Sequence, residues 1–145
     1  MIKQRQNAGA CCAPPPGGPP AQQTFPSSDE TPGKVRRYVR EILAHDDQPL
    51  GDAKLDALLL MVSELTTNAY RYGTEPGDSM LVKVLPLLTV VRVEVHDTRR
   101  KRPQIRDESG ERARGRGLHI VEALASRWGV DDRPFGKAVW VELER

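Results

Sequence analysis

The sequence has few of the features that often indicate the function of a protein directly. Its two cysteines, Cys11 and Cys12, are neighbours in a proline- and glycine-rich stretch. Adjacent cysteines give no useful disulfide framework, and a zinc site needs more ligands. No apolar run reaches the roughly 18 residues that cross a bilayer. The N-terminal stretch lacks the apolar segment of a signal peptide or lipoprotein anchor, so we expect a reduced, cytoplasmic protein.

An excess of charge of one sign is also absent, because the net charge is +2. Such a balance does not mark a nucleic-acid or membrane protein. The basic run at 99–102 is followed at once by acidic residues (Asp107, Glu108 and Glu111) and has no interleaved aromatic side chains. A solvated lid is the favoured interpretation of this run, and nucleic-acid binding is the weaker alternative. The three histidines have no metal-ligand spacing, and no serine lies in a nucleophile motif.

The length of 145 residues fits one domain with a real core. Residues 1–21 are rich in proline and glycine, so we expect a disordered or locally polyproline-like tail. The folded domain is expected at residues 22–145.

Apolar periodicity within this domain predicts alternating helices and strands. Helices are expected from Thr31, as the N-cap, to near His45, from after Gly51 to Gly73, and from Gly115 onward with Leu124 facing inward. Strands are expected at 22–26, 80–85, 89–97, around Val130 and at 138–143. Residues 98–114 show no periodicity and are expected to form a lid. Helices mixed in this way with mainly antiparallel strands predict an α/β (α+β) two-layer sandwich, with the helices on one face of a mixed sheet.

The segment SELTTNAYRYG, residues 63–73, carries the first candidate site. Glu64 and Asn68 are four residues apart, so they share one face of the predicted helix, beside its apolar stripe. An Asn oxygen can ligate a hard cation, and a Glu can orient or deprotonate a hydroxyl. The pair therefore suits a magnesium-phosphate site.

Asp97 is the second candidate, because it continues the valine face of a strand. Val91, Val93 and Val95 alternate with Arg92, Glu94 and His96, which points Asp97 toward the core. A buried carboxylate needs a partner. The alternative is that Asp97 caps the following turn.

Gly115-Arg116-Gly117 at a predicted helix start is the third candidate. Glycines allow a phosphate to approach the backbone, and the free N–H groups and dipole of a helix N-terminus favour an anion. Arg114 and Arg116 would add charged contacts. A flexible hinge is the alternative.

These elements in this order resemble the GHKL nucleotide-binding domains, the fold shared by gyrase, histidine kinases and heat-shock chaperone ATPases. The chain is most similar to the small anti-sigma-factor serine/threonine kinases. SELTTNAYRYG resembles their N box, VEVHDTRRKRP their first glycine-box region, and GRGLHIVEALASRWGV with GKAVWVEL their second glycine box and closing strand. The resemblance covers about residues 22–144 and implies a Bergerat-type ATP-binding fold.

The resemblance also implies roles for individual residues. Asn68 would ligate the Mg²⁺ that bridges the ATP phosphates, and Glu64 would act on the hydroxyl to be phosphorylated. Asp97 would accept a hydrogen bond from the adenine amino group. The other nucleotide-contacting residues would lie at the lid hinge, and they are Arg114, Gly115, Arg116, Gly117 and Leu118.

The implied function is that of a cytoplasmic, ATP- and Mg²⁺-dependent serine kinase and anti-sigma factor, with a homodimer as the family's habit. Its partners would be a sigma factor and an anti-anti-sigma (STAS-type) protein, with no direct nucleic acid and no membrane. Tyr72 stands where the family usually has His, and Ala138 where it commonly has a Thr that supports the adenine-binding Asp. These two departures leave open a nucleotide-gated binding module without significant phosphotransfer.

Overall fold

The computed structural model describes residues 20–98 and 112–145, and for residues 112–117 it describes the backbone alone. The described elements run in the order β1 (Ala21–Pro26), α1 (Thr31–Ala44), α2 (Asp52–Asn68), the π-helix η1 (Ala69–Gly73), β2 (Ser79–Pro86), β3 (Val90–Asp97), α3 (Arg112–Leu124), β4 (Arg127–Arg133) and β5 (Gly136–Glu144).

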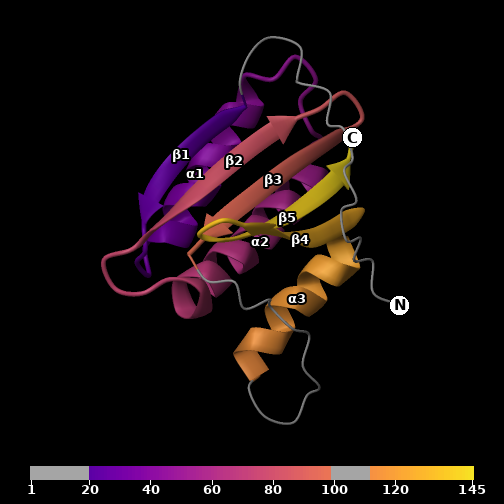
Figure 1. Cartoon of the computed structure of the whole chain (residues 1–145). Helices are drawn as coiled ribbons and strands as arrows, with labels where there is room; N and C mark the ends of the chain where they lie inside the picture. The colour runs from indigo at the N-terminus through magenta and orange to yellow at the C-terminus, as the bar shows by residue number, and fades with distance from the viewer. Residues whose placement is uncertain (1–19, 99–111) are drawn as a thin grey trace.

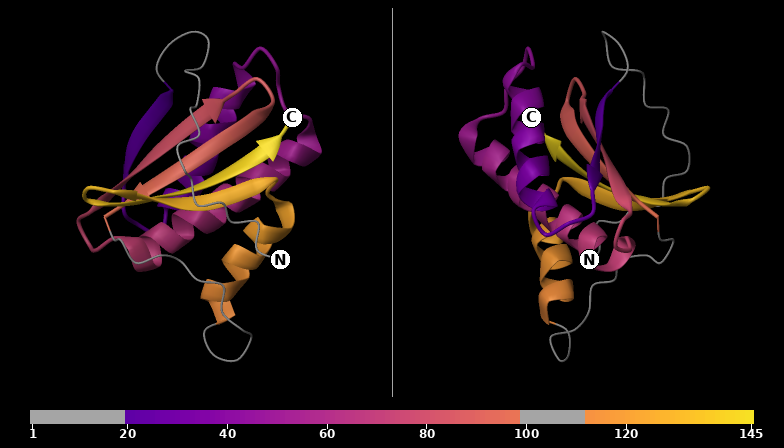
Figure 2. Two further views of the ribbon diagram at one scale, coloured as in Figure 1. Left: turned by 45° about the vertical axis from the view of Figure 1, so that its right-hand side comes forward. Right: turned by 90° about the vertical axis from the view of Figure 1, so that its left-hand side faces the viewer.

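The strands form one sheet in the order β1-β2-β3-β5-β4. Every described strand pair is antiparallel. The helices lie on one face of this sheet, which leaves its other face turned toward the viewer in Figure 1, and the side-on view shows the two layers (Figure 2). The predicted α+β two-layer sandwich is therefore confirmed, with antiparallel pairing throughout the described sheet.

The centre of the core is a ladder of aliphatic pairs between β3 and β5. Val95 pairs with Val139, Val93 with Val141, and Val91 with Leu143. All six side chains are buried, because alternate residues of each strand face the helices. β-branched residues suit such a half-covered, pleated surface. This ladder fixes the register of the two strands that carry the site described below.

The helices cover the ladder with apolar stripes at helical spacing. In α1 the buried positions Val35, Val39 and Leu43 recur every four residues, as expected for one helical face. The helix includes Thr31 itself, with Glu30 at the N-cap, so Thr31 is not the cap that its sequence position suggested. The Thr31 hydroxyl instead donates to the carbonyl of Pro26 and ties β1 to α1.

Helix α2 has a broad buried face because it packs between α1 and α3 and against the sheet. Leu58, Met61, Val62 and Leu65 are all almost fully covered. The α-helix ends at Asn68, and the last turn continues as the π-helix η1. The predicted single helix up to Gly73 is thus a helix with a widened final turn.

Two element boundaries and the exposure of one side chain differ from the sequence expectation. Strand β1 begins at Ala21, one residue inside the segment assigned to the tail. Helix α3 begins at Arg112, three residues before Gly115. Leu124, expected to face inward, is partly exposed because it is the last residue of that helix. None of the helices in the described ranges combines the length and the apolar character needed to cross a membrane.

Candidate functional site

Asp97 lies at the end of the β3–β5 ladder and is paired with a cation. The register places Asp97 directly opposite Lys137, the next pair after Val95 and Val139 on the helix-facing side. Lys137 Nζ donates to Asp97 Oδ1 at 2.8 Å. The two side chains are 5% and 3% exposed, so this is a buried ion pair. The prediction that Asp97 is buried and needs a partner is confirmed, and Lys137 provides one within the chain.

Asp97 packs closely against two residues that have no side chain, Gly73 and Gly136. A Cβ added to Gly73 would lie 2.3 Å from Asp97 Oδ2, which is far inside van der Waals contact. A Cβ on Gly136 would lie 1.8 Å from the Asp97 carbonyl oxygen. Gly136 also has φ of 150°, a backbone conformation that other residues rarely adopt. The end of η1 and the start of β5 therefore enclose this one acidic residue.

Glu64 and Asn68 lie on the last two turns of α2. Both side chains are half-buried, beside rather than within the core. Neither makes a hydrogen bond or an ion pair with any other residue in the described ranges. Polar groups that are held on a rigid helix without protein partners are available to a ligand.

The π-helix connects these two residues to Asp97. Asn68 ends α2, and the five residues of η1 lead to Gly73, which contacts the Asp97 carboxylate. π-helical turns are rare and frequently occur at functional sites, because they redirect a helix and its side chains. Asn68 is thus about one helical turn along the chain from Gly73, the residue that lies against the buried carboxylate.

A hydrogen-bonded junction holds this corner of the molecule together. The Thr98 hydroxyl lies 3.2 Å from the carbonyl oxygen of Gly73 and 3.1 Å from Asp78 Oδ2. The hydroxyl of Thr74 donates back to the Ala69 carbonyl at 3.0 Å, which closes the π-helical turn. Thr98 therefore ties the end of β3 to the end of η1 beside Asp97, and the Thr74 hydroxyl holds the turn of η1 itself.

The predicted lid and glycine box fall largely outside the described residues. Of the lid predicted at 98–114, residues 99–111 are not described and residues 112–114 belong to α3, and the side chains of Arg114 and Arg116 also lie outside the description. Gly115 and Gly117 lie within α3 rather than at its start, because the helix already begins at Arg112. Leu118 is 1% exposed and belongs to the core cluster, so any contact with a nucleotide would be made by its backbone.

The oxygen donors of this site suit a hard cation whose other ligands are waters and phosphate oxygens rather than protein groups. In the described part of the chain, no group of three His, Cys, Asp or Glu residues could hold a metal ion. Asn68 offers one amide oxygen that has no hydrogen-bond partner among the described residues. Mg²⁺ prefers oxygen ligands and usually keeps waters and phosphate oxygens in its shell. Asn68 therefore fits a metal–nucleotide complex rather than a metal bound by protein alone.

Sequence reasoning missed Lys137 and misjudged Ala138. Ala138 pairs with His96, so its side chain faces the sheet side opposite to Asp97. A Thr in its place would not reach the Asp97 carboxylate, and the support comes from Lys137. The signal was present, because alternation from Val141 and Val139 places residue 137 on the buried face. The π-helix left no recognisable signal in the sequence.

A comparison with known protein families identifies the domain. Residues 25–143 match the family model of the histidine kinase-like ATPase domain. A search among curated proteins returns no match. The matched range covers most of the chain and contains Glu64, Asn68, Asp97 and Lys137. The chain therefore belongs to the histidine kinase-like ATPase domain family, and its fold is that of a GHKL-type ATP-binding domain.

Proposed function

We propose that this ATP-binding domain is a serine/threonine protein kinase that acts as an anti-sigma factor in the cytoplasm. The observation that carries the proposal is the arrangement at the end of α2. Glu64 and Asn68 lie one turn apart without partners among the described residues, and η1 continues the helix to Gly73, which lies against the buried Asp97. A metal ligand, a general base and a carboxylate that recognises adenine are the parts that such a phosphotransfer requires.

Each residue contributes one function to this proposed reaction. Asp97, held by Lys137, accepts a hydrogen bond from the exocyclic amino group of adenine. Asn68 holds the magnesium ion that neutralises the phosphate charge when ATP is bound. Glu64 orients the serine hydroxyl of the substrate and accepts its proton. Positioning and charge neutralisation provide most of the rate in phosphoryl transfer, so a small domain suffices.

The partners follow from the motif order that resembles the small anti-sigma-factor kinases. The chain would bind a sigma factor and phosphorylate a serine on an anti-anti-sigma (STAS-type) protein, and a homodimer is the expected assembly. The mixed charge of the chain, with a net value of +2, supports protein partners over nucleic acid.

Nucleotide binding is tested first, because the kinase proposal depends on it. Isothermal titration with ATP, with and without Mg²⁺, should show magnesium-dependent binding to the wild-type chain. Asn68→Ala should abolish the magnesium dependence, and Asp97→Asn should weaken binding of ATP more than that of a nucleotide without the adenine amino group. Thr67→Ala, at the half-buried neighbouring position of α2, is the matched control. Binding that survives both variants would contradict the site.

Phosphotransfer is tested separately with Mg-ATP and a cognate STAS-type protein. Phosphoserine on that protein should form with the wild-type chain, and Glu64→Gln should slow its formation by about 100-fold or more, the contribution of a general base. Asp56→Asn alters an exposed carboxylate of the same helix and should leave the rate unchanged. Absence of phosphoserine from an assay in which ATP demonstrably binds would exclude the kinase and retain the ATP-binding domain.

A nucleotide-gated binding module is the second candidate. It is favoured by Tyr72, a half-buried residue of η1 at a position where the resembled kinases usually have His. In this case ATP sets the affinity for a protein partner without phosphotransfer. Glu64→Ala would then leave nucleotide-dependent partner binding intact, whereas Asn68→Ala would abolish it. Loss of regulation in the Glu64 variant alone would exclude the module.

A further inference from the structure

The charged pair at the end of the β3–β5 ladder is unusual for its position. The preceding pairs on the same face are aliphatic, and the row then continues with Asp97 opposite Lys137. Lysine is rarely buried, yet both members of this pair are. A buried ion pair is often no more stabilising than apolar side chains of similar volume. Stability alone therefore does not account for a lysine at the start of β5, and a role in binding does.

The backbone beside Lys137 is held directly against the end of β3. A Cβ on Gly136 would lie 2.9 Å from Thr98 Cα, so the two strands meet there without room for a side chain. From the next residue, the Lys137 ammonium reaches Asp97 Oδ1 at 2.8 Å. The register also places Asp132 of β4 opposite Lys137, but Asp132 is exposed at the edge of the sheet. Lys137 is thus fixed beside the carboxylate that the proposed site uses for adenine.

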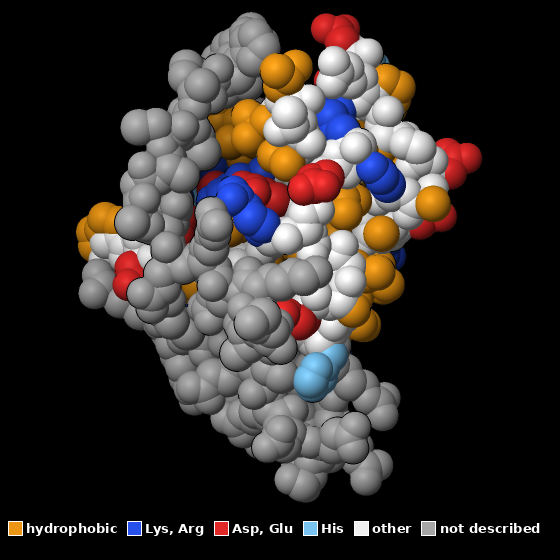
Figure 3. Space-filling model, turned by 90° about the vertical axis from the view of Figure 1, so that its right-hand side faces the viewer, with side chains coloured by type: hydrophobic (Ala, Val, Ile, Leu, Met, Phe, Trp, Pro, Cys, Tyr) orange, Lys and Arg blue, Asp and Glu red, His pale blue; other side chains and the backbone are white. Residues whose placement is uncertain are grey.

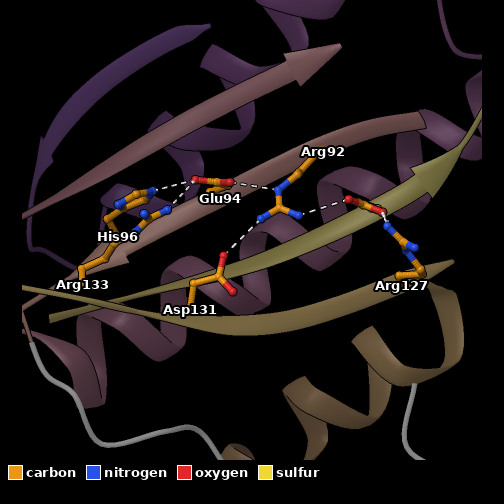
Figure 4. A network of polar contacts seen from close by, with 7 residues as sticks. Arg92, Glu94, His96, Arg127, Asp131 and Arg133 are labelled. Atoms are coloured by element: carbon orange, nitrogen blue, oxygen red, sulfur yellow. Dashed lines mark hydrogen bonds and ion pairs between the residues drawn. The ribbon is translucent and has the colours of Figure 1, made fainter. Parts of the chain in front are cut away.

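The charged residues on the opposite face of these strands form a separate network. Arg92 contacts Glu94 at 2.9 Å and Glu142 at 3.1 Å, and Figure 4 shows the contacts continuing across β3, β5 and β4. The further members are Asp131, Arg127, Arg133 and His96. Burial alone would raise the pKa of Glu94, but the hydrogen bonds and charges of His96 and Arg92 outweigh it and lower the pKa to about 2.

This network balances its own charges. Its acidic members are each in contact with an arginine, and Figure 3 shows basic and acidic side chains touching one another rather than a field of one sign. Alternation places it on the other side of β3 and β5 from Asp97 and Lys137. The charge beside the proposed adenine site therefore comes from the Asp97–Lys137 pair and not from the network.

Asp97 and Lys137 offer an acceptor and a donor side by side. An ionised carboxylate only accepts hydrogen bonds, and an ammonium only donates them through three N–H groups, of which one bonds to Asp97. The Watson–Crick edge of adenine has the complementary order, because its N6 amino group donates and the adjacent N1 accepts. Hypoxanthine has the reverse order, since O6 accepts and N1–H donates. The pair therefore matches adenine and opposes hypoxanthine in the same orientation.

We propose that Lys137 is a specificity-determining residue of the nucleotide site, which donates a hydrogen bond to N1 of adenine while Asp97 accepts one from the N6 amino group. The assignment rests on the proposed function, because it requires that ATP binds at Asp97. With ATP bound, the same ammonium serves both the carboxylate and the base. Recognition at two atoms discriminates more strongly than the carboxylate alone, because a mismatched base leaves buried charged groups without partners.

Isothermal titration of the full-length chain with magnesium complexes of ATP analogues tests the assignment. 1-Deaza-ATP keeps the amino group and replaces N1 by C–H. It should bind roughly 10- to 100-fold more weakly than ATP, the usual worth of a hydrogen bond to a charged group. Inosine triphosphate reverses both positions and should bind more weakly still. 7-Deaza-ATP also lacks a ring nitrogen, but on the other edge of the base, and it is the ligand control.

Substitution of Lys137 separates recognition of N1 from neutralisation of Asp97. In Lys137→Met, ATP and 1-deaza-ATP should bind equally well, to within about twofold, whereas the ratio of the affinities for ATP and 7-deaza-ATP should stay as in wild type. A lysine that only neutralises Asp97 would weaken ATP and 1-deaza-ATP alike and leave their ratio unchanged. Asp97→Asn with Lys137→Met has no unpaired buried charge, so it provides the same comparison if Lys137→Met does not fold.

Asp132→Asn is the matched control variant. It alters the carboxylate opposite Lys137 on β4 and retains the ammonium, so the preference for ATP over 1-deaza-ATP should stay at the wild-type value.

Equal binding of ATP and 1-deaza-ATP by the wild-type chain would overturn the assignment and leave the ATP site intact. The same preference in the wild type and in the Lys137 variants would also overturn it, because another group would then recognise N1. A wild-type chain that binds none of these nucleotides would contradict the proposed function itself, and the assignment would fail with it.

Discussion

Replacing Lys137 with methionine removes the cation that faces Asp97 while retaining most of the side-chain volume. The two groups are 2.8 Å apart and their side chains are 5% and 3% exposed, so water cannot easily replace the lost ammonium. Methionine fills the space of the lysine stem without bringing a new polar group. The substitution therefore isolates the effect of leaving a buried carboxylate without its cation.

The expected cost follows from this burial. Removing one partner of a buried ion pair destabilises a protein by about 3–5 kcal/mol, because the remaining charge is uncompensated. We expect the lower end of this range, a destabilisation of about 3 kcal/mol, because Asp97 lies at the end of β3, beside Thr98 and the end of η1, at a corner of the molecule. For a chain of this length that loss lowers the Tm by roughly 10 °C. Removing both charges should cost less than removing one, so Asp97→Asn with Lys137→Met should be more stable than Lys137→Met alone.

Urea unfolding followed by circular dichroism measures these free energies, and the four chains form a double-mutant cycle. The coupling between the two positions should be at least about 2 kcal/mol. Lys83→Met is the matched control, because Lys83 is a half-buried strand lysine that has no ion pair within the described ranges. A Lys137→Met chain that loses no more than the Lys83 variant, within about 0.5 kcal/mol, would refute the buried pair.

Three further predictions concern stability. Gly73→Ala should destabilise the chain by about 1–3 kcal/mol and weaken ATP binding, because its Cβ would lie 2.3 Å from the Asp97 carboxylate; Gly51→Ala, with nothing within 4 Å, should be close to neutral in the same unfolding assay. The pKa of Glu94 is lowered to about 2. Its carboxylate therefore contributes about 3 kcal/mol to the free energy of unfolding above pH 5, and this contribution is lost as the pH falls toward 2. Glu94→Gln should flatten that part of the curve of unfolding free energy against pH. Gly33→Ala in α1 should stabilise by about 0.5–1 kcal/mol in thermal unfolding, since its nearest new contact is an ordinary 3.6 Å.

The sheet and its helical layer were predictable because both depend on local periodicity. The alternation of Val91, Val93 and Val95 fixed one face of β3, and the four-residue spacing of Val35 and Val39 fixed the stripe of α1. The ends of the helices were less predictable, because helix propensity changes little from one residue to the next and does not mark the exact first or last residue. Thr31 is a good N-cap residue, yet its hydroxyl bonds with the Pro26 carbonyl, a contact between elements that periodicity cannot show.

The candidate site was predictable in its members and not in its internal contacts. Glu64 and Asn68 followed from helical spacing, and the burial of Asp97 followed from the valine face. The partner of Asp97 lies 40 residues away, so identifying Lys137 required the register between β3 and β5. The family resemblance directed attention to Ala138 instead, one residue from the true contact and on the wrong face. Neighbouring residues of a strand point to opposite faces of the sheet, so an assignment that is wrong by one position always selects the wrong face.

The two faces of β3 and β5 show why buried charge is hard to read from a sequence. Alternation assigned Arg92 and Glu94 to the side away from the helices, which in a two-layer fold usually means water. Their partners Glu142 and Asp131 come from strands almost at the end of the chain, and only pairing brings the charges together. Once paired, the group has almost no net charge, which lowers the cost of its burial. Trp140 follows the same alternation and lies beneath Arg92, 4.0 Å from the ring centroid to the guanidinium, so this contact too depends on the register between β3 and β5.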